Sequence, residues 1–437
     1  MNWFLSPLLL CHLVEEIVNS HFIAISLGSF IIIPYLCIAG NPSRKFRHGN
    51  SVMKNERKMA RKKAKKLENP FVYQGYEGPE YFFDRTEETE NILSSLRNGR
   101  NITLISPRKI GKTGLIRHTF QQIDNGNDDI ICIYVDIFAT QNLQQFVETV
   151  GKAIMEDALQ REKSFASKVM DFFKGLRPTF SPDPMTGLPT VTLNVVPVQV
   201  EITLKSLFDH LEKLDKRVFL AIDEFQQIAC YPEKGVEALL RSHIQFMHNV
   251  RFIFSGSRMH MMEEMFLSPN RPFYQSTQLM TLSPLHEDIY YDYARRFFEE
   301  KRGQLDQGIF QRIYRSFDGY TWYVQAILNR LYEQDRVVKD EQQVADAILF
   351  HVGSNAPHYQ TVFSFLTDNQ RSLLRAIAFV GMVKQPQSGD FIRENNLPSS
   401  SSVKTALETL LEKELIYQTA EGYIVYDRFF AVWLKRL

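Results

Sequence analysis

The chain has few cysteines and no broad excess of positive charge. Four cysteines in 437 residues are too few for a disulfide framework, and they favour a reducing compartment such as the cytosol. Residues 1–66 hold 11 basic and only 3 acidic side chains, so residues 67–437 hold 40 basic and 47 acidic ones. Residues 67–437 are therefore net acidic and lack the wide basic surface that nonspecific nucleic-acid binding needs.

Charge is also absent from one stretch near the start. Residues 22–40 carry no charged side chain, and this length can just span a hydrocarbon core. The first twenty residues contain no lysine or arginine, which argues against a cleaved signal peptide. Because Met53 and Met59 offer later starts, we favour the interpretation that residues 1–66 result from a misassigned start. The alternative is one membrane anchor at 22–40 followed by a basic linker, with the rest of the chain in the cytoplasm.

The chain does contain a near match to a phosphate-binding loop, in which only the first glycine is replaced, by Ser106. An apolar run at 101–105 precedes it, and a helix-forming stretch follows. In such a loop, backbone N–H groups surround phosphate oxygens at the N-terminus of a helix. The nucleotide-binding candidates are Ser106, Pro107, Arg108, Lys109, Ile110, Gly111, Lys112, Thr113 and Gly114. We expect Lys112 to reach the β- and γ-phosphates and Thr113 to hold Mg²⁺.

A second apolar run, at 217–222, ends in two adjacent carboxylates, Asp223 and Glu224. On a parallel strand these acids lie at the carboxyl edge of the sheet, where ligands of open α/β sheets bind. We expect Asp223 to hold Mg²⁺ together with Thr113, and Glu224 to polarise the water that attacks the γ-phosphate. The alternative is a strand that ends in an ordinary solvated turn.

A third apolar run, at 250–254, ends in a small polar turn at 255–257. Ser255 and Ser257 either contact the γ-phosphate or the attacking water, or belong to a plain strand-ending turn. Two further strands are predicted at 131–136 and 278–282. Five strands with helical stretches between them predict a three-layer α/β domain of the P-loop NTPase type with a parallel sheet, which we place at 67–285.

The remainder of the chain has helical periodicity. We expect a helical lid at 286–358 and a winged helix at 359–437, with its wing at 416–418 and 422–426. The exposed positions of the third helix, predicted at 402–415, include Glu408, Glu412 and Glu414. A helix that enters the DNA major groove needs cations and amides. We therefore favour a protein partner for the winged helix over DNA.

The chain resembles the predicted ATPases of the archaeal and bacterial STAND and origin-recognition type, within the wider AAA+ group. Besides the loop and the acidic strand end, residues 83–88 resemble an upstream element of that family, matching it at Arg85 and Glu88. The resemblance implies that ATP is the nucleotide and that this element, with Arg85, packs near adenine. Residues 319–322 resemble the Gly-x-Pro element of the lid, with Thr321 in place of proline.

These observations predict a Mg²⁺-dependent ATPase whose nucleotide state repositions the lid and the winged helix. Two alternatives stay open: an ATP-dependent DNA-binding protein of the origin-recognition type, and a nucleotide-gated scaffold with little turnover. An oligomer is compatible with this class, and Arg258 is a candidate for an arginine that acts on a neighbouring subunit.

Overall fold

The computed structural model describes residues 66–126, 129–160, 179–182, 189–192, 195, 199–419 and 421–437. The stretch at 22–40, the anchor of the alternative interpretation, and nearly all of the basic linker that follows it lie outside these residues. Within the described part of the chain, none of the helices has both the length and the apolar character needed to cross a membrane. Residues 67–437 form one compact unit. The cytoplasmic placement stays a prediction.

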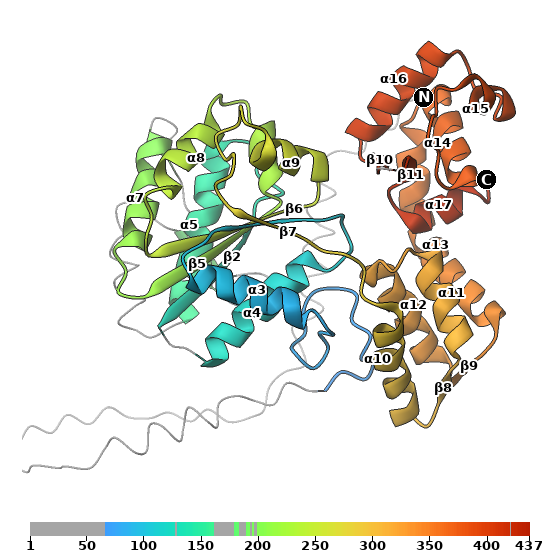
Figure 1. Ribbon diagram of the computed structural model, residues 1–437, viewed down its shortest axis with the longest axis horizontal. Helices are drawn as coiled ribbons and strands as arrows, with labels where there is room; N and C mark the ends of the chain where they lie inside the picture. The colour runs from blue at the N-terminus through green and yellow to red at the C-terminus, as the bar shows by residue number, and fades with distance from the viewer. Residues whose placement is uncertain are drawn as a thin grey trace, which may run out of the picture. The chain divides into compact units, whose positions relative to one another are not determined.

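A five-stranded sheet lies at the centre of the first half of this unit (Figure 1). Its strand order is β2-β5-β6-β1-β7 and every pair is parallel. The bounds are β1 Ile102–Ile105, β2 Ile130–Asp136, β5 Arg217–Asp223, β6 Val250–Gly256 and β7 Gln278–Thr281. All five predicted strands are confirmed. Four of them are buried and nearly continuous apolar runs, which stand out in the sequence, whereas β7 is a largely exposed edge strand.

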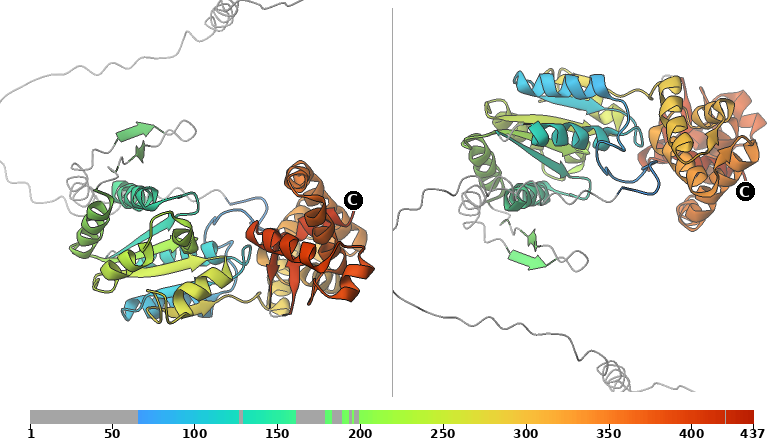
Figure 2. Two further views of the ribbon diagram at one scale, coloured as in Figure 1. Left: turned by 90° about the horizontal axis from the view of Figure 1, so that it is seen from above. Right: turned by 90° about the horizontal axis from the view of Figure 1, so that it is seen from below.

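Helices cover both faces of the sheet, as the two views of Figure 2 show. One face packs against α3 (Thr86–Arg97) and α4 (Lys112–Gly126). The helices that pack against the other face are α5 (Leu143–Gln160), α7 (Val200–Glu212), α8 (Val236–Ile244) and α9 (Met259–Leu267), with the 3₁₀ helix η3 (Phe225–Cys230). Along the chain, a hairpin of β3 (Thr179–Pro182) and β4 (Pro189–Thr192) follows α5 and precedes α7. The three-layer α/β prediction is confirmed.

The lid and the winged helix share one hydrophobic core. The lid helices are α10 (Glu287–Glu300), α11 (Gln307–Ser316), α12 (Thr321–Gln334) and α13 (Glu341–Ser364), with β8 (Gln304–Leu305) paired to β9 (Val337–Val338). The winged helix comprises α14 (Asp368–Val380), α15 (Gly389–Glu394), α16 (Ser400–Glu412), β10 (Ile416–Gln418), β11 (Tyr423–Val425) and α17 (Arg428–Leu434).

The boundary proposed at 358/359 falls inside α13, which runs without a break from the lid into the winged helix. Two side chains of this helix pack on α17: His351 stacks on Phe429 at 5.3 Å, and the Tyr359 ring lies 5.0 Å from that of Phe430. The lid and the winged helix are therefore joined by both a helix and a core.

Candidate functional site

The phosphate-binding loop connects the end of β1 to the start of α4 at Lys112. Lys109 and Gly111 have left-handed backbones, with φ of 68° and 106°. Ser106 is not among the described non-glycine residues with positive φ. The backbone at the position where the loop pattern has its first glycine therefore does not need the left-handed region, and a Cβ is compatible with it.

The Lys112 ammonium is folded back onto its own loop. It donates to the carbonyl oxygens of Ser106, at 2.6 Å, and Pro107, at 3.0 Å. Burial lowers the pKa of Lys112 to about 8, although the carboxylates of Glu224 and Asp223 oppose this shift. The Lys112 ammonium thus lies within the loop that is predicted to bind phosphate, and phosphate oxygens can replace the two carbonyl oxygens that hold it.

Asp223 ends β5 and is buried, with 3% of its surface exposed. Its Oδ2 accepts hydrogen bonds from the Thr113 hydroxyl at 2.8 Å and the Tyr134 hydroxyl at 2.7 Å. Its Oδ1 accepts from the Glu224 amide at 3.0 Å. Burial and the neighbouring Asp223 raise the pKa of Tyr134, so this phenol is a neutral donor. A hydroxyl and a carboxylate in contact are the hard oxygen ligands that suit Mg²⁺ with phosphate.

Glu224 directly follows Asp223 and has a left-handed backbone, with φ of 55°. Its Oε2 accepts from Gln226 Nε2 at 2.5 Å and from the Ser257 hydroxyl at 2.7 Å. The same Ser257 hydroxyl accepts from Arg108 Nε at 3.2 Å. The candidate base is therefore connected through Ser257 to the phosphate-binding loop.

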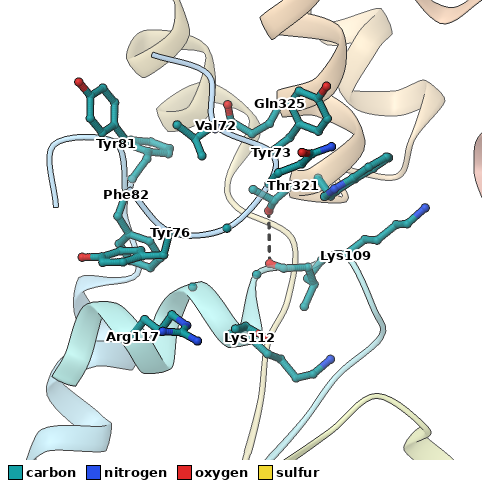
Figure 3. A pocket seen from close by; sticks show the side chains of 18 of the residues that line it. Val72, Tyr73, Tyr76, Tyr81, Phe82, Lys109, Lys112, Arg117, Thr321 and Gln325 are labelled. Atoms are coloured by element: carbon teal, nitrogen blue, oxygen red, sulfur yellow. Dashed lines mark hydrogen bonds between the residues drawn. The ribbon is translucent and has the colours of Figure 1, made fainter. Parts of the chain in front are cut away.

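A cavity of about 480 Å³ lies beside the loop (Figure 3). Arg85, Glu224 and every loop residue from Arg108 to Gly114 line it, which brings most of the predicted site together. Aromatic side chains also line the cavity: Tyr73, Tyr76, Tyr81, Phe82, Phe83 and Trp322. The volume of the cavity falls within the range of small-molecule sites, and aromatic side chains near a phosphate loop are compatible with a nucleotide base.

Five predicted residues do not line this cavity: Ser106, Pro107, Asp223, Ser255 and Ser257. Ser255 is fully buried on β6, and its hydroxyl has no partner among the described residues. Arg85 donates to Glu88 at 2.6 Å and to the Ser283 carbonyl at 2.7 Å. The nucleotide contacts of Arg85 and Ser255 stay predictions, as do the other assigned roles.

The lid contacts the loop through the start of α12. The Trp322 amide donates to the Lys109 carbonyl at 3.0 Å, and the Thr321 hydroxyl donates to the Ile110 carbonyl at 3.4 Å (Figure 3). The Lys109 ammonium lies 4.2 Å from the Trp322 ring centre and 4.4 Å from that of Tyr323. No arginine stands at 319–322, so the cation at this junction comes from the loop itself.

The winged helix contacts the same loop through three side chains. Glu414 pairs with Arg108 at 3.1 Å and also with Arg258. The Tyr426 hydroxyl accepts from the Arg108 amide at 3.2 Å, and Asp427 pairs with Lys109 at 2.9 Å. The expectation that Glu414 is an exposed residue of the third helix is wrong. The helix ends at Glu412, and the left-handed backbone of Glu414 (φ 54°) follows it.

Sequence reasoning missed Tyr134, Arg117, Tyr426 and Asp427 as residues at or beside the site. Arg117 follows Thr113 by one helical turn, a spacing that places both on one face of α4. Its guanidinium lies 4.2 Å from the centre of the Tyr134 ring. For Tyr426 and Asp427 we find no local signal, since only folding brings them to a loop more than 300 residues away.

Comparison with family profiles gives two matches. The profile described as an ATPase domain predominantly from Archaea matches residues 82–327. The profile described as a probable winged helix domain matches residues 357–436. Among curated proteins, none matches the chain significantly.

Two solved structures are similar in fold over most of the chain. A Walker-type ATPase of Pyrococcus abyssi matches with a TM-score of 0.58 and 17% identity, covering 84% of this chain and all of that one. The Aeropyrum pernix ORC2 protein, solved as ADPNP-ADP complexes, matches with a TM-score of 0.52 and 16% identity, covering 84% of this chain and 95% of that one. At such identities the likeness shows the fold.

Proposed function

The chain belongs to the family of ATPase domains found predominantly in Archaea, and from this premise we propose that it is a Mg²⁺-dependent ATP switch. ATP binding and hydrolysis change the position of its winged helix. The observation that carries this proposal is the set of contacts from Glu414, Tyr426 and Asp427 to Arg108 and Lys109 of the phosphate-binding loop.

The site residues have the chemistry that hydrolysis needs. Lys112 leaves the carbonyls of its loop and binds the β- and γ-phosphates, where its charge stabilises the transition state. Thr113 and Asp223 would hold Mg²⁺, which neutralises phosphate charge when bound. Glu224 orients and polarises the attacking water once its carboxylate accepts a hydrogen bond from that water in addition to those from Gln226 and Ser257.

The same loop gives ATP a means of moving the winged helix. A bound triphosphate brings negative charge to Arg108 and Lys109, and it competes there with the carboxylates of Glu414 and Asp427. Arg108 also donates to Ser257, which donates to Glu224. Release of Glu414 therefore changes the hydrogen bonds around the base as well as the docking of the winged helix.

Hydrogen exchange of the full-length protein tests this proposal. We expect amides of α16, β10, β11 and α17 to exchange faster with a non-hydrolysable ATP analogue and Mg²⁺ than without them, because the ion pairs to the loop are lost. Lys112→Ala should abolish this response, whereas the exposed Lys205→Ala should keep it. Unchanged exchange in a wild-type protein that demonstrably binds the analogue would refute the switch.

We further propose that the released winged helix binds a protein. The exposed side chains of α16 include Lys404, Glu408 and Glu412, a mixed surface that suits a protein better than a DNA backbone. Affinity capture with the Glu224→Gln variant in ATP should retain this partner. A salt-sensitive gel shift with duplex DNA at low salt would instead favour DNA as the partner of the winged helix. Light scattering of the same samples would show whether the protein forms an oligomer.

A further inference from the structure

Tyr134 contacts Asp223, a predicted metal ligand, and the proposed mechanism gives Tyr134 no role. Its hydroxyl donates to Asp223 Oδ2 at 2.7 Å, the same oxygen that accepts from Thr113 at 2.8 Å. Tyr134 stands on β2, which is the strand paired with β5 in parallel register. The hydroxyl therefore reaches the carboxylate from the neighbouring strand, whereas Thr113 reaches it from α4.

The two hydroxyl donors to Asp223 Oδ2 differ in their surroundings. Thr113 lies on the wall of the cavity and is predicted to share its hydroxyl oxygen with Mg²⁺. Tyr134 does not line that cavity and its ring is covered by Arg117, whose guanidinium lies 4.2 Å from the ring centre. A contact of this kind fixes an aromatic ring. Tyr134 is thus a donor that keeps its place whatever Thr113 binds.

The hydroxyl has no evident value for packing. On the same face of β2, Ile130 and Cys132 belong to a buried apolar cluster against which Tyr134 packs, and phenylalanine at 134 would fill the same space. A phenol in a half-buried position instead loses hydration, and the bond to a charged acceptor offsets that loss.

We propose that Tyr134 is a positioning residue that holds Asp223 in the orientation in which this carboxylate and Thr113 take the Mg²⁺ of the nucleotide. This inference rests on the proposed function. Groups that orient a metal ligand without touching the metal commonly change metal affinity by about 10- to 100-fold.

The test is a Mg²⁺ titration of nucleotide binding by the full-length Tyr134→Phe variant, read by a fluorescent non-hydrolysable ATP analogue. We expect the Mg²⁺ concentration for half-maximal binding to rise about tenfold, and binding in EDTA to stay at the wild-type level. The Mn²⁺ paramagnetic resonance spectrum of the complex, which reports the metal directly, should show the same weakening. Asp223→Asn should give a larger shift, and the double variant should not exceed Asp223→Asn alone, because Tyr134 acts through Asp223.

Tyr231→Phe is the matched control, because Tyr231 is a buried tyrosine whose hydroxyl contacts that of Thr140 at 2.5 Å, outside the cavity. It should leave the Mg²⁺ titration unchanged. Wild-type Mg²⁺ dependence in Tyr134→Phe would overturn the inference, as would equal shifts in both phenylalanine variants, which would indicate general loosening of the sheet. Failure of the proposed function gives a different result: nucleotide binding by the wild-type protein would itself not respond to Mg²⁺.

Discussion

Lys112 and Lys109 are three residues apart in one loop, yet their side chains belong to different halves of the site. Lys112 donates to carbonyls five and six residues away and lies near Asp223 and Glu224; we call these three residues and Thr113 the inner half. Lys109 donates to Tyr323 and Asp427, 214 and 318 residues away; with Arg108, Glu414 and Tyr426 these residues form the outer half. The inner half has the groups for phosphate chemistry. The outer half connects the loop to the lid and the winged helix.

The largest effect is expected from replacing Glu224, the carboxylate of the inner half that is predicted to act as the base. Glu224→Gln should lower ATP turnover by about 10²- to 10⁴-fold, because the amide cannot accept a proton from water. Binding of ATP should persist, since the phosphate contacts come from the loop. Steady-state hydrolysis and equilibrium binding measure the two effects, with the exposed Glu90→Gln as control. Undiminished turnover would remove Glu224 from its role.

The two lysines of the loop provide the next test. Lys112→Ala should reduce kcat/KM by about 10²- to 10³-fold, the usual cost of losing a preorganised charge at the reacting phosphates. Lys109→Ala should reduce it by less than about tenfold, because we expect its ammonium to serve the interface rather than the transition state. Phosphate-release kinetics of both variants decide the matter. Equal losses would erase the distinction between inner and outer halves.

Lys112 also predicts a pH dependence. Burial lowers its pKa to about 8 before nucleotide binds, and phosphates beside the ammonium raise it in the complex. Only the protonated form pairs with phosphate, so ATP affinity should be constant below pH 8. It should fall by up to about tenfold per pH unit above that value, until the pKa of the complex is reached.

Isothermal titration between pH 7 and 9.5 gives this slope. The Lys109→Ala variant should keep it, since the slope is assigned to Lys112, which that variant retains. A flat profile in the wild-type protein would contradict the assignment of Lys112.

The smallest expected effect comes from the outer half. Glu414→Gln should raise ATP affinity by about two- to fivefold, the size expected for a half-exposed ion pair that competes with phosphate for Arg108. The exposed Asp390→Asn, whose partner Arg393 lies on the same helix, should have no effect. Both affinities are measurable by fluorescence titration. A weaker affinity in Glu414→Gln would mean that Glu414 positions Arg108 for ATP rather than withholding it.

Much of the fold followed from local patterns. The four buried strands β1, β2, β5 and β6 were predicted because each is a short apolar run, and the wing at β10 and β11 lies where the sequence indicates it. The replacement of the first loop glycine by Ser106 is explained by a backbone that a Cβ permits. The course of α13 through the proposed boundary was not evident, because Pro357 lies inside the helix beside that boundary, and a proline usually marks the end of a helix.

The sequence by itself determined the inner half of the site. A loop pattern, a strand and two carboxylates at the strand end are contiguous segments, and parallel strands bring their carboxyl ends to one edge of a sheet. Only the tertiary structure decided the outer half and the role of Tyr134. Glu414, Tyr426 and Asp427 reach the loop because the lid and the winged helix pack around one shared core, and the Tyr134 hydroxyl meets Asp223 through the pairing of β2 with β5. Such contacts depend on the packing of distant surfaces, for which no local spacing in the chain is a signal.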